Sequence, residues 1–299
     1  MGSRRRSLQI SLIGAGAVGT TLAVLLSRRG NHRIVSVISR DVRGAARCAK
    51  LLGCDLFSHS IADISPRTEF LLIATPDESI HNVAHAVSKL RHLSIRNLRA
   101  CHVSGVLSSD ALKPLARKGA LVFSLHPLQT FPSHDSIPRQ LASMKNISYG
   151  VEGSAAAKRF AKKLMKDLGG RMFPVPKEEK ILYHIACVIA SNYLIALEGL
   201  VEELVRRLGN QSGLDHFSSL IESSMRNGIR LSPAKALTGP IARGSSAIVR
   251  RHLKRLGREK DLRLLYQLLG LQTLRLAIRG ARLTRKQARE LKMILTNAE

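Results

Sequence analysis

ISLIGAGAVG, at residues 10–19, is the stretch that decides the fold of this chain. It places a G-x-G-x-x-G pattern between an apolar run of strand length and the start of a helical pattern. The first glycine permits a tight turn, the second lets the backbone approach a pyrophosphate, and the third lets the helix pack closely on the strand. Unpaired N–H groups at the start of the helix then face the phosphates. The residues predicted to bind these phosphates are Gly14, Gly16, Ala17, Val18 and Gly19.

The neighbouring sequence supports this interpretation, which a lone G-x-G-x-x-G would not carry. Residues 8–13 form the apolar strand, residues 18–28 space their leucines as a helix does, and residues 30–31 offer a turn. A second strand is predicted over residues 34–38. The alternative is a glycine-rich turn in some other α/β protein.

The end of the second predicted strand favours NADP over NAD. A fold that selects NAD usually ends this strand with Asp or Glu, about 20 residues after the glycines, to bind the ribose 2′-hydroxyl. This strand ends instead in Ser39 and Arg40, with Arg43 one helical turn further. A hydroxyl and two guanidinium groups suit a 2′-phosphate. The alternative is that both arginines belong to a generally basic surface.

Composition predicts a globular protein of two domains without a membrane span. A chain of 299 residues can build two cores, and its apolar content of 44% includes no apolar run near 18 residues. The four cysteines are scattered, which is typical of a reducing compartment and favours a cytoplasmic location. The arginine-rich start at residues 3–8 superficially resembles an export signal, but cleavage there would remove the glycine turn.

A formal net charge of +27 predicts non-specific, salt-sensitive adhesion to nucleic acid. Aromatic residues make up only 4% of the chain and Trp is absent, so platforms for stacking single-stranded bases are scarce. The charge therefore indicates general adhesion more than a dedicated nucleic-acid site.

Strand and helix patterns alternate up to about residue 176, which is typical of a doubly wound parallel sheet. Further strands are predicted at residues 70–74, 100–103, 121–124, 146–151 and 171–175, and helices at 42–52, from Asp77 as N-cap, at 109–117 and at 154–168. Helical patterns then cover residues 178–208, 213–228, 245–256, 259–279 and 285–296. We predict an α/β fold, with a doubly wound parallel Rossmann sheet over residues 1–176 followed by an all-helical domain over residues 177–299.

Four further motifs go beyond a generic dinucleotide fold: HVSG at residues 102–105, HPLQTF at 126–131, YH at 183–184 with SNY at 191–193, and LTGPIARG at 237–244. Together they resemble the Rossmann-like family whose C-terminal half is catalogued as domain of unknown function 2520, often labelled an NADP- or deazaflavin-dependent oxidoreductase by analogy. That family is similar to pyrroline-5-carboxylate reductase, ketopantoate reductase and the β-hydroxyacid dehydrogenases. The resemblance implies NADP binding, hydride transfer, and a helical domain of the 6-phosphogluconate dehydrogenase C-terminal type that forms a homodimer. It implies no substrate.

Two positions depart from these relatives. The family usually continues GPIARG with Asp, whereas this chain has Ser245, which removes a carboxylate but can still cap the next helix. The β-hydroxyacid dehydrogenases place Lys four residues before an Asn, whereas here Val188 precedes Asn192 by four.

Three histidines are candidates for the acid or base that accompanies hydride transfer. His102 and His126 lie at the carboxyl ends of predicted parallel strands, where such sheets bind ligands. His184 stands eight residues before Asn192, so a helix can bring both to one cleft wall. The candidate catalytic residues are His102, His126, His184 and Asn192, with Tyr183 and Ser191 as weaker candidates. For the histidines the alternative is a structural role with satisfied hydrogen bonds, and for His184 and Asn192 an ordinary polar pair on a helix surface.

Two other segments carry candidate binding residues. Arg243, Gly244 and Ser245 precede a helix and are predicted to hold an anionic group of the substrate, with a tight turn and an exposed arginine as the alternative. The residues predicted to border the nicotinamide or its ribose are Thr75, Pro76 and Ser104. No metal site is predicted, because His81 and His85 share a helix face without an evident third ligand.

The sequence thus favours an NADP-dependent oxidoreductase acting on a small substrate, expected to be anionic, in a cleft between the domains. A non-catalytic NADP-binding sensor or interaction module is the alternative from another class. The serine at 245 and the missing lysine favour that alternative, whereas the retained histidines and Asn192 favour the enzyme. A nucleic-acid-associated protein is a third hypothesis that rests on charge alone.

Overall fold

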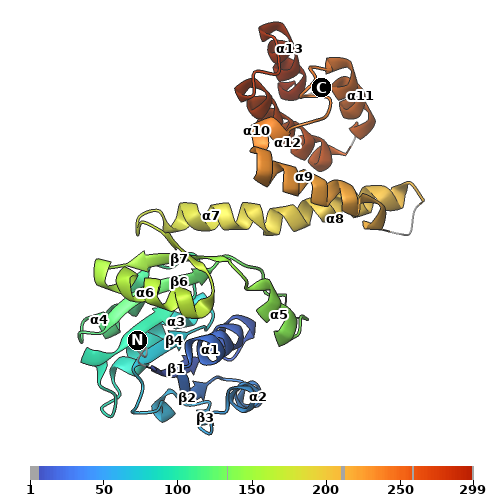
Figure 1. Ribbon diagram of the computed structural model, residues 1–299. Helices are drawn as coiled ribbons and strands as arrows, with labels where there is room; N and C mark the ends of the chain where they lie inside the picture. Colours follow the sequence, from blue (N-terminus) through green and yellow to red (C-terminus); the bar gives the residue numbers. More distant parts are fainter. Residues whose placement is uncertain (1–6, 133, 210–212, 258, 298–299) are drawn as a thin grey trace, which may run out of the picture. The chain divides into compact units, whose positions relative to one another are not determined.

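The computed structural model in Figure 1 describes residues 7–132, 134–209, 213–257 and 259–297, so the arginines at positions 4–6 lie outside the described residues. Packing divides the chain into two compact units, residues 1–196 and residues 197–299. The first unit holds the sheet together with the first helix that follows it. The division into a cofactor-binding part up to residue 176 and a helical part from residue 177 stays a prediction. By packing alone, residues 177–196 belong with the sheet.

An eight-stranded sheet forms the centre of the first unit, with the strand order β3-β2-β1-β4-β5-β6-β7-β8. Its strands are β1 (Gln9–Ile13), β2 (Arg33–Ile38), β3 (Phe57–Ser58), β4 (Phe70–Ile73), β5 (Arg99–His102), β6 (Leu121–Pro127), β7 (Ser148–Gly153) and β8 (Arg171–Pro174). The predicted Rossmann sheet is confirmed. Only β3 was missed, because two residues are too few to show an alternation of apolar and polar side chains.

One strand pair departs from the predicted parallel sheet, since β7 runs antiparallel to β6. The connection contains a single short helix, α5 (Ile137–Ser143). Seven helical residues span about 10 Å, about half the length of the seven-residue strand β6, so this helix does not carry the chain back to the amino end of the sheet. The strand β8 is again parallel to β7, after a full crossover through α6 (Ala155–Leu168).

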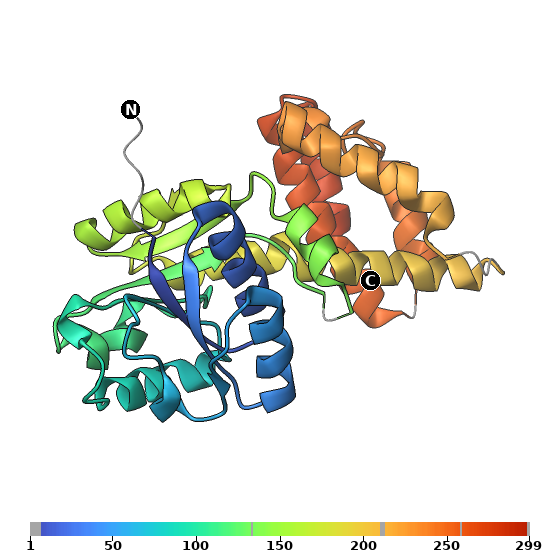
Figure 2. The same cartoon turned by 60° about the horizontal axis from the view of Figure 1, so that its bottom comes forward.

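Helices cover both faces of the sheet (Figures 1 and 2). Alternate residues of one strand enter opposite cores: Leu12 packs with the helices α1 (Ala17–Gly30), α2 (Val42–Leu52) and α6, whereas its neighbour Ile13 packs with α3 (Asp77–Ser88) and α4 (Lys113–Ala116). Short 3₁₀ turns join these elements at η1 (Ile61–Asp63), η2 (Ile95–Asn97) and η3 (Ser109–Leu112). Since both faces are covered, the strands read as continuous apolar runs.

The predicted single helix over residues 178–208 is two helices, α7 (Lys180–Ala190) and α8 (Asn192–Arg207). Ser191 separates them, with φ −128° and ψ −72°. Its hydroxyl donates to the carbonyl of Cys187 at 2.7 Å, a local bond of the kind that bends helices.

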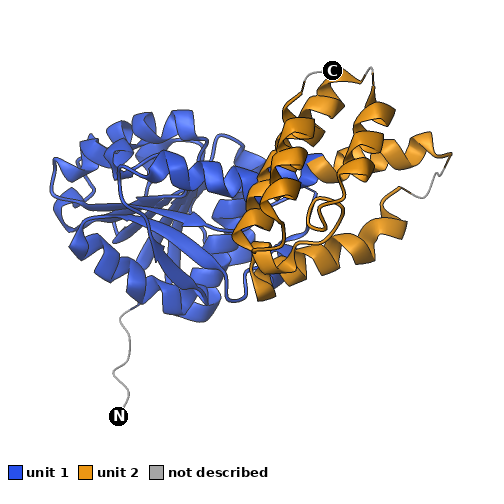
Figure 3. Cartoon of the chain, turned by 90° about the horizontal axis from the view of Figure 1, so that it is seen from above, with its two compact units in different colours: residues 1–196 blue, residues 197–299 orange. Residues whose placement is uncertain are grey.

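The second unit, orange in Figure 3, consists of helices in its described part, which agrees with the prediction. They are the remainder of α8, η4 (Asp215–Phe217), α9 (Ser218–Leu231), α10 (Pro233–Ala236), α11 (Ser246–Leu256), α12 (Lys260–Arg279) and α13 (Arg285–Thr296). Its core is formed by Ile241, Val249, Leu253, Leu274, Leu291, Ile294 and Leu295.

Within the described residues, one helical stretch, Lys180–Arg207, is long and apolar enough by length and composition to cross a membrane. This stretch corrects the expectation that the chain contains no apolar run near 18 residues. A core helix of a soluble protein meets the same two criteria, so length and composition alone do not make α7 and α8 a membrane span.

Candidate functional site

The glycine turn joins β1 to α1, and two of its three glycines are required by the fold itself. Gly14 has a positive φ of 100°, and a methyl group there would collide with the carbonyl of Ala74. A methyl group at Gly19 would collide with the carbonyl of Gly14. At Gly16, in contrast, a methyl group would meet nothing within 4 Å. The protein's own packing therefore gives no reason for glycine at position 16, and the space beside it is open.

Besides the open space at Gly16, the side chain of Thr75 also indicates that a ligand binds beside this turn. It follows β4, and its backbone N would lie 3.0 Å from a methyl group on Gly14. Its hydroxyl is buried and has no hydrogen-bond partner among the described residues. Buried hydroxyls are normally satisfied, so an unpartnered one next to an open glycine turn fits a polar ligand such as a dinucleotide.

The residues predicted to bind the 2′-phosphate lie at the end of β2. Arg40 and Arg43 are exposed, and Ser39 is bonded through its N–H to the carbonyl of Ser58 at 3.0 Å. One acid that was not considered among the predicted residues lies here: Asp41 occupies the N-cap position of α2. Its carboxylate lies 3.6 Å from the guanidinium of Arg47, six residues further along the chain. The exposed arginines thus stand beside an acid that already has a cationic neighbour.

His102 is buried within hydrogen bonds of its own loop. Its Nδ1 lies 3.2 Å from the N–H of Ser104 and its Nε2 lies 3.0 Å from the carbonyl of Ser108. Nδ1 must accept and Nε2 must donate, so this imidazole is neutral. Burial lowers the pKa of His102 to about 4, with a further contribution from Lys180. Both ring nitrogens are therefore occupied, and the side chain is completely buried.

The Ser104 hydroxyl is also occupied. It donates to the carboxylate of Asp77 at 2.9 Å and accepts the N–H of Leu107 at 3.0 Å. Asp77 was predicted to cap α3, but Pro76 holds the N-cap position and Asp77 is the first helical residue. The Asp77 carboxylate thus bonds the loop after β5, and it does not occupy the N-cap position of α3.

The aromatic side chains of His126, Tyr183 and His184 lie close together near the carboxyl ends of β5 and β6. His126 Nδ1 lies 2.8 Å from the hydroxyl of Tyr183, and their rings are perpendicular. A methyl group on Gly105 would lie 2.7 Å from His184 Cδ2 and 3.0 Å from His126 Nε2. Gly105 therefore lies close to both imidazoles, and a side chain at this position would collide with His184. Gly150, which pairs with His126 across β6 and β7, leaves room for the phenol of Tyr183 in the same way.

Sequence reasoning missed Lys180, the first residue of α7. It is only 2% exposed, and its ammonium group donates to the carbonyl of Ser104 at 3.3 Å and to the hydroxyl of Ser124 at 3.2 Å. Burial lowers the pKa of Lys180, while the carboxylate of Glu152 opposes that shift. The signal that could have revealed it is a lysine at the start of an apolar helix, three residues before Tyr183 of the YH motif.

The predicted residues His126, His184 and Asn192 line one pocket of 740 Å³. Asn192 Oδ1 accepts the hydroxyl of Ser191 at 3.0 Å. Burial, Lys180 and His184 together lower the pKa of His126 to about 4. The remaining lining combines apolar and uncharged polar side chains: Leu128, Gln129, Thr130, Phe131, Pro132, Cys187, Val188, Ala190, Ser191 and Ile195.

The predicted anion-binding residues belong to the second unit. Gly244 has a positive φ of 71°, and a methyl group there would collide with the side chain of Gln287. Ser245 holds the N-cap position of α11, but its side chain makes no capping hydrogen bond. The expectation that this serine preserves the cap is therefore wrong, because its backbone, at ψ 72°, is outside the usual extended range of a cap residue.

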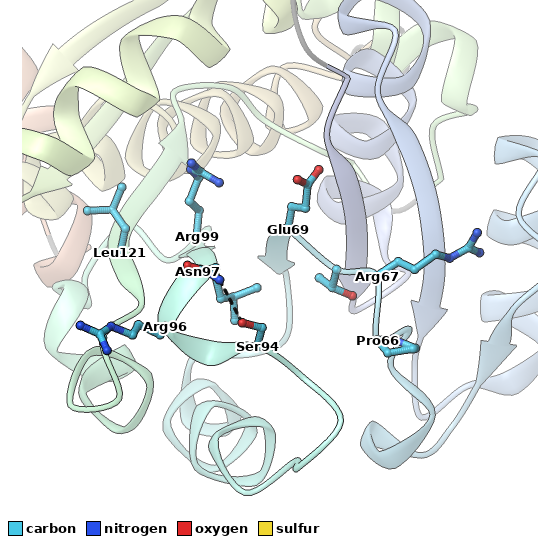
Figure 4. A pocket seen from close by; sticks show the side chains of 11 residues that line it. Pro66, Arg67, Glu69, Ser94, Arg96, Asn97, Arg99 and Leu121 are labelled. Atoms are coloured by element: carbon cyan, nitrogen blue, oxygen red, sulfur yellow. Dashed lines mark hydrogen bonds between the residues drawn. The ribbon is translucent and has the colours of Figure 1, made fainter.

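Another pocket, of 580 Å³, lies beside the amino ends of β4, β5 and β6 (Figure 4). Three arginines line it, but Figure 4 shows Arg67 and Arg96 pointing in different directions, away from Arg99. Arg99 lies over the ring of Phe160, 5.2 Å from its centre. The guanidinium groups do not converge on one ligand position. Within the described residues, no group of three His, Cys, Asp or Glu side chains is placed to hold a metal ion.

Two family models match the chain. A Rossmann-like domain covers residues 2–127, and the domain of unknown function 2520 covers residues 147–273. The chain is a Rossmann-like protein with a DUF2520 domain. The boundaries place β1 to β6 in the first match, and β7, β8, α7 and α8 in the second. No curated protein matches this DUF2520 protein.

Solved structures share the fold of this DUF2520 protein. A Bacteroides fragilis protein labelled a candidate NADP oxidoreductase is 24% identical, with a TM-score of 0.70 over 88% of this chain and 96% of that one. A Thermotoga maritima protein is 23% identical, with a TM-score of 0.73 over 91% and 99%. A pyrroline-5-carboxylate reductase from Coxiella burnetii is 13% identical, with a TM-score of 0.56 over 96% and 99%. The TM-scores show a common fold, while identities below 25% leave the substrate open.

Proposed function

We propose that this protein is an NADP-dependent oxidoreductase that transfers a hydride to or from a small substrate bound beside His126, His184 and Asn192. The observation that carries the proposal is the open space at Gly16, in a turn whose other two glycines are required by packing. A pyrophosphate that approaches the backbone accounts for glycine at that position. The unpartnered hydroxyl of Thr75 beside the same turn supports it.

The cofactor residues have separate roles in this proposal. The N–H groups at the start of α1 bind the pyrophosphate, and Ser39, Arg40 and Arg43 bind the 2′-phosphate. The hydroxyl of Thr75 hydrogen-bonds the cofactor, while Pro76 and the Ser104 loop border the nicotinamide or its ribose. When bound, the cofactor supplies or accepts the hydride.

His126, His184 and Asn192 bind and orient the substrate in the 740 Å³ pocket. His102 is assigned no part in proton transfer, because both its nitrogens are occupied. His184 is the histidine proposed to exchange a proton with the substrate, since it lines the pocket and lies on the far side of Gly105 from His126.

The remaining proposals concern the substrate charge and the assembly. Arg243, Gly244 and Ser245 bind an anionic group of the substrate. The protein acts in the cytoplasm as a homodimer, in which α7 and α8 contribute to the interface. Large apolar side chains on these helices support the dimer, because Ile181, Ile189 and Ile195 are each more than half exposed.

Calorimetric titration with NADPH and NADH, at two salt concentrations, tests the cofactor proposal. Specific binding should persist at the higher salt, whereas adhesion from the +27 charge should weaken steeply. Replacing Arg40→Asp together with Arg43→Ala should weaken NADPH binding at least tenfold and leave NADH binding nearly unchanged. The matched control is Lys50→Ala, which removes an exposed cation from the last turn of α2. Equal NADPH affinity in the double variant and the control would contradict the assignment.

A non-catalytic NADP-binding sensor is the second candidate, favoured by Val188 and Ser245 at the two positions where the relatives carry Lys and Asp. It predicts the same binding isotherm. The two functions differ in turnover, because only the enzyme oxidises NADPH when small keto acids, ketones and imines are supplied.

A further inference from the structure

Four residues of β6 and β7 lie on one face of the sheet. Ser124 and His126 are two positions apart on β6, and Glu152 and Gly150 pair with them across β7. Lys180 bonds Ser124, and Tyr183 bonds His126, so one turn of α7 spans this face. The arrangement places a buried ammonium group next to the tyrosine–histidine pair.

The positive charge of Lys180 has only hydrogen-bonding partners at close range. In the described part of the chain it forms no ion pair within 4 Å, and its hydrogen bonds go to the carbonyl of Ser104 and the hydroxyl of Ser124. Glu152 attracts it from a longer distance, while that carboxylate is held by the hydroxyl of Ser109 at 2.9 Å. The ammonium group also lies 5.5 Å from the ring centre of Tyr183. A cation this close opposes a second positive charge on His126, and it lowers the pKa of that imidazole.

We propose that Lys180 is a positioning residue that fixes His126 as a neutral imidazole with its proton on Nε2. Burial raises the pKa of Tyr183, so its hydroxyl keeps its proton and can donate to Nδ1, which leaves the imidazole proton on Nε2. His126 then offers a hydrogen bond that can polarise a substrate carbonyl or imine, and it does not give up a proton. The catalytic meaning rests on the proposed function, whereas the protonation state is measurable on the protein alone.

The charged and titratable groups around His126 in the described part of the chain come from two elements. The helix α7 contributes Lys180, Tyr183, His184 and Cys187, and β7 contributes Glu152. The loop after β5 places the uncharged Gly105 against the His126 ring. Burial acts in the same direction as Lys180, so the test must separate charge from burial.

Nitrogen NMR of the full-length protein, labelled at histidine, gives this separation. The His126 resonances are assigned by their loss in His126→Gln. In the wild-type protein we expect a proton on Nε2, a bare Nδ1 and a titration midpoint far below 6.5. In Lys180→Met, which keeps the apolar stem, the midpoint should rise by about one pH unit. In Lys180→Arg, which keeps the charge, it should stay low.

Lys177→Met is the matched control, because Lys177 is an exposed lysine near the start of the same helix and is paired with Asp110. It should leave the His126 midpoint unchanged. A proton on Nδ1 in the wild-type protein would overturn the proposal, as would equal midpoints in Lys180→Met and the wild-type protein. A rise in Lys180→Arg as large as in Lys180→Met would also overturn it, because packing would then be the cause. None of these readings requires NADPH, so failure of the cofactor proposal is seen separately in the calorimetry.

Discussion

At Gly14 and Gly19 a methyl group would meet the protein's own backbone, whereas at Gly16 it would meet nothing within 4 Å. The same residue type thus serves folding at two positions and leaves room for a ligand at the third. Around the histidines, Gly105 and Gly150 serve the packing of His184 and Tyr183. Glycine-to-alanine substitutions can therefore distinguish glycines that the fold requires from a glycine that leaves room for a ligand.

Gly16→Ala should keep the stability of the free protein and lose NADPH binding. The added methyl group meets no protein atom but occupies the space proposed for the pyrophosphate. We expect a melting temperature within a few degrees of the wild type and an affinity reduced at least tenfold, measured by thermal unfolding and calorimetry. Gly199→Ala, at an open helical position, is the control and should bind NADPH normally. Unchanged NADPH affinity in Gly16→Ala would place the pyrophosphate elsewhere.

Stability should fall as the pH drops from 6.5 towards 4. Burial lowers the pKa of both His102 and His126 from 6.5 to about 4, so the unfolded chain binds protons in this range that the folded protein does not. Each histidine then costs about 1.4 kcal/mol of stability per pH unit, and the contribution is fully present only above pH 6.5. Urea unfolding between pH 7 and 5 measures this slope. His126→Gln should reduce it, whereas His81→Gln, on the exposed face of α3, should not.

At the scale of elements, α7 presents different residues on its two sides. Lys180, Tyr183 and His184 follow helical spacing and contact the strand ends, while Ile181 and Ile185 are exposed. The helix ends at Ser191, whose hydroxyl bonds Cys187, so Asn192 begins a new helix beside the pocket. The interruption places Asn192 on the pocket wall together with His184.

Helix ends in the second unit depend on individual caps, and α13 has the most complete one. Thr284 bonds the N–H of Gln287, and the Gln287 side chain bonds the N–H of Thr284. Thr284→Ala should lower stability by about 1 kcal/mol, measured by urea unfolding of the full chain. Thr273→Ala, which removes a hydroxyl bonded only to a carbonyl of its own helix, should change it little. Equal losses in the two variants would show that the cap contributes nothing specific.

At the scale of the whole molecule, charge and apolar surface suggest opposite behaviour. A net charge of +27 disfavours self-association through long-range repulsion, and this repulsion weakens with salt. The exposed isoleucines of α7 and α8 favour association over a short range. A homodimer that forms through these helices should therefore become tighter as salt rises.

Ile185→Glu should shift the protein from dimer to monomer at micromolar concentration, because a buried carboxylate without a partner is costly in an interface. Sedimentation velocity at two salt concentrations measures the shift. The control is Ile229→Glu, on α9, where the isoleucine is 86% exposed. A wild-type protein that sediments only as a monomer would rule out the dimer.

Sequence determined the features that depend on local spacing. Apolar runs of strand length identified most of the sheet, the 3.6-residue period identified most helices, and the glycine spacing identified the turn at residues 14–19. Motif order placed His126, His184 and Asn192 as candidates, and they line one pocket. These features are local because strand, helix and turn geometry repeat over a few residues.

Only the tertiary structure decided which chemistry surrounds each candidate. The contact of Lys180 with Ser104 spans 76 positions, and no sequence period connects them. The occupied nitrogens of His102, the antiparallel β7 and the break at Ser191 likewise arise from bonds made after the chain has folded. Burial and charge come from residues distant in sequence, so the protonation of a histidine is fixed by the assembled fold.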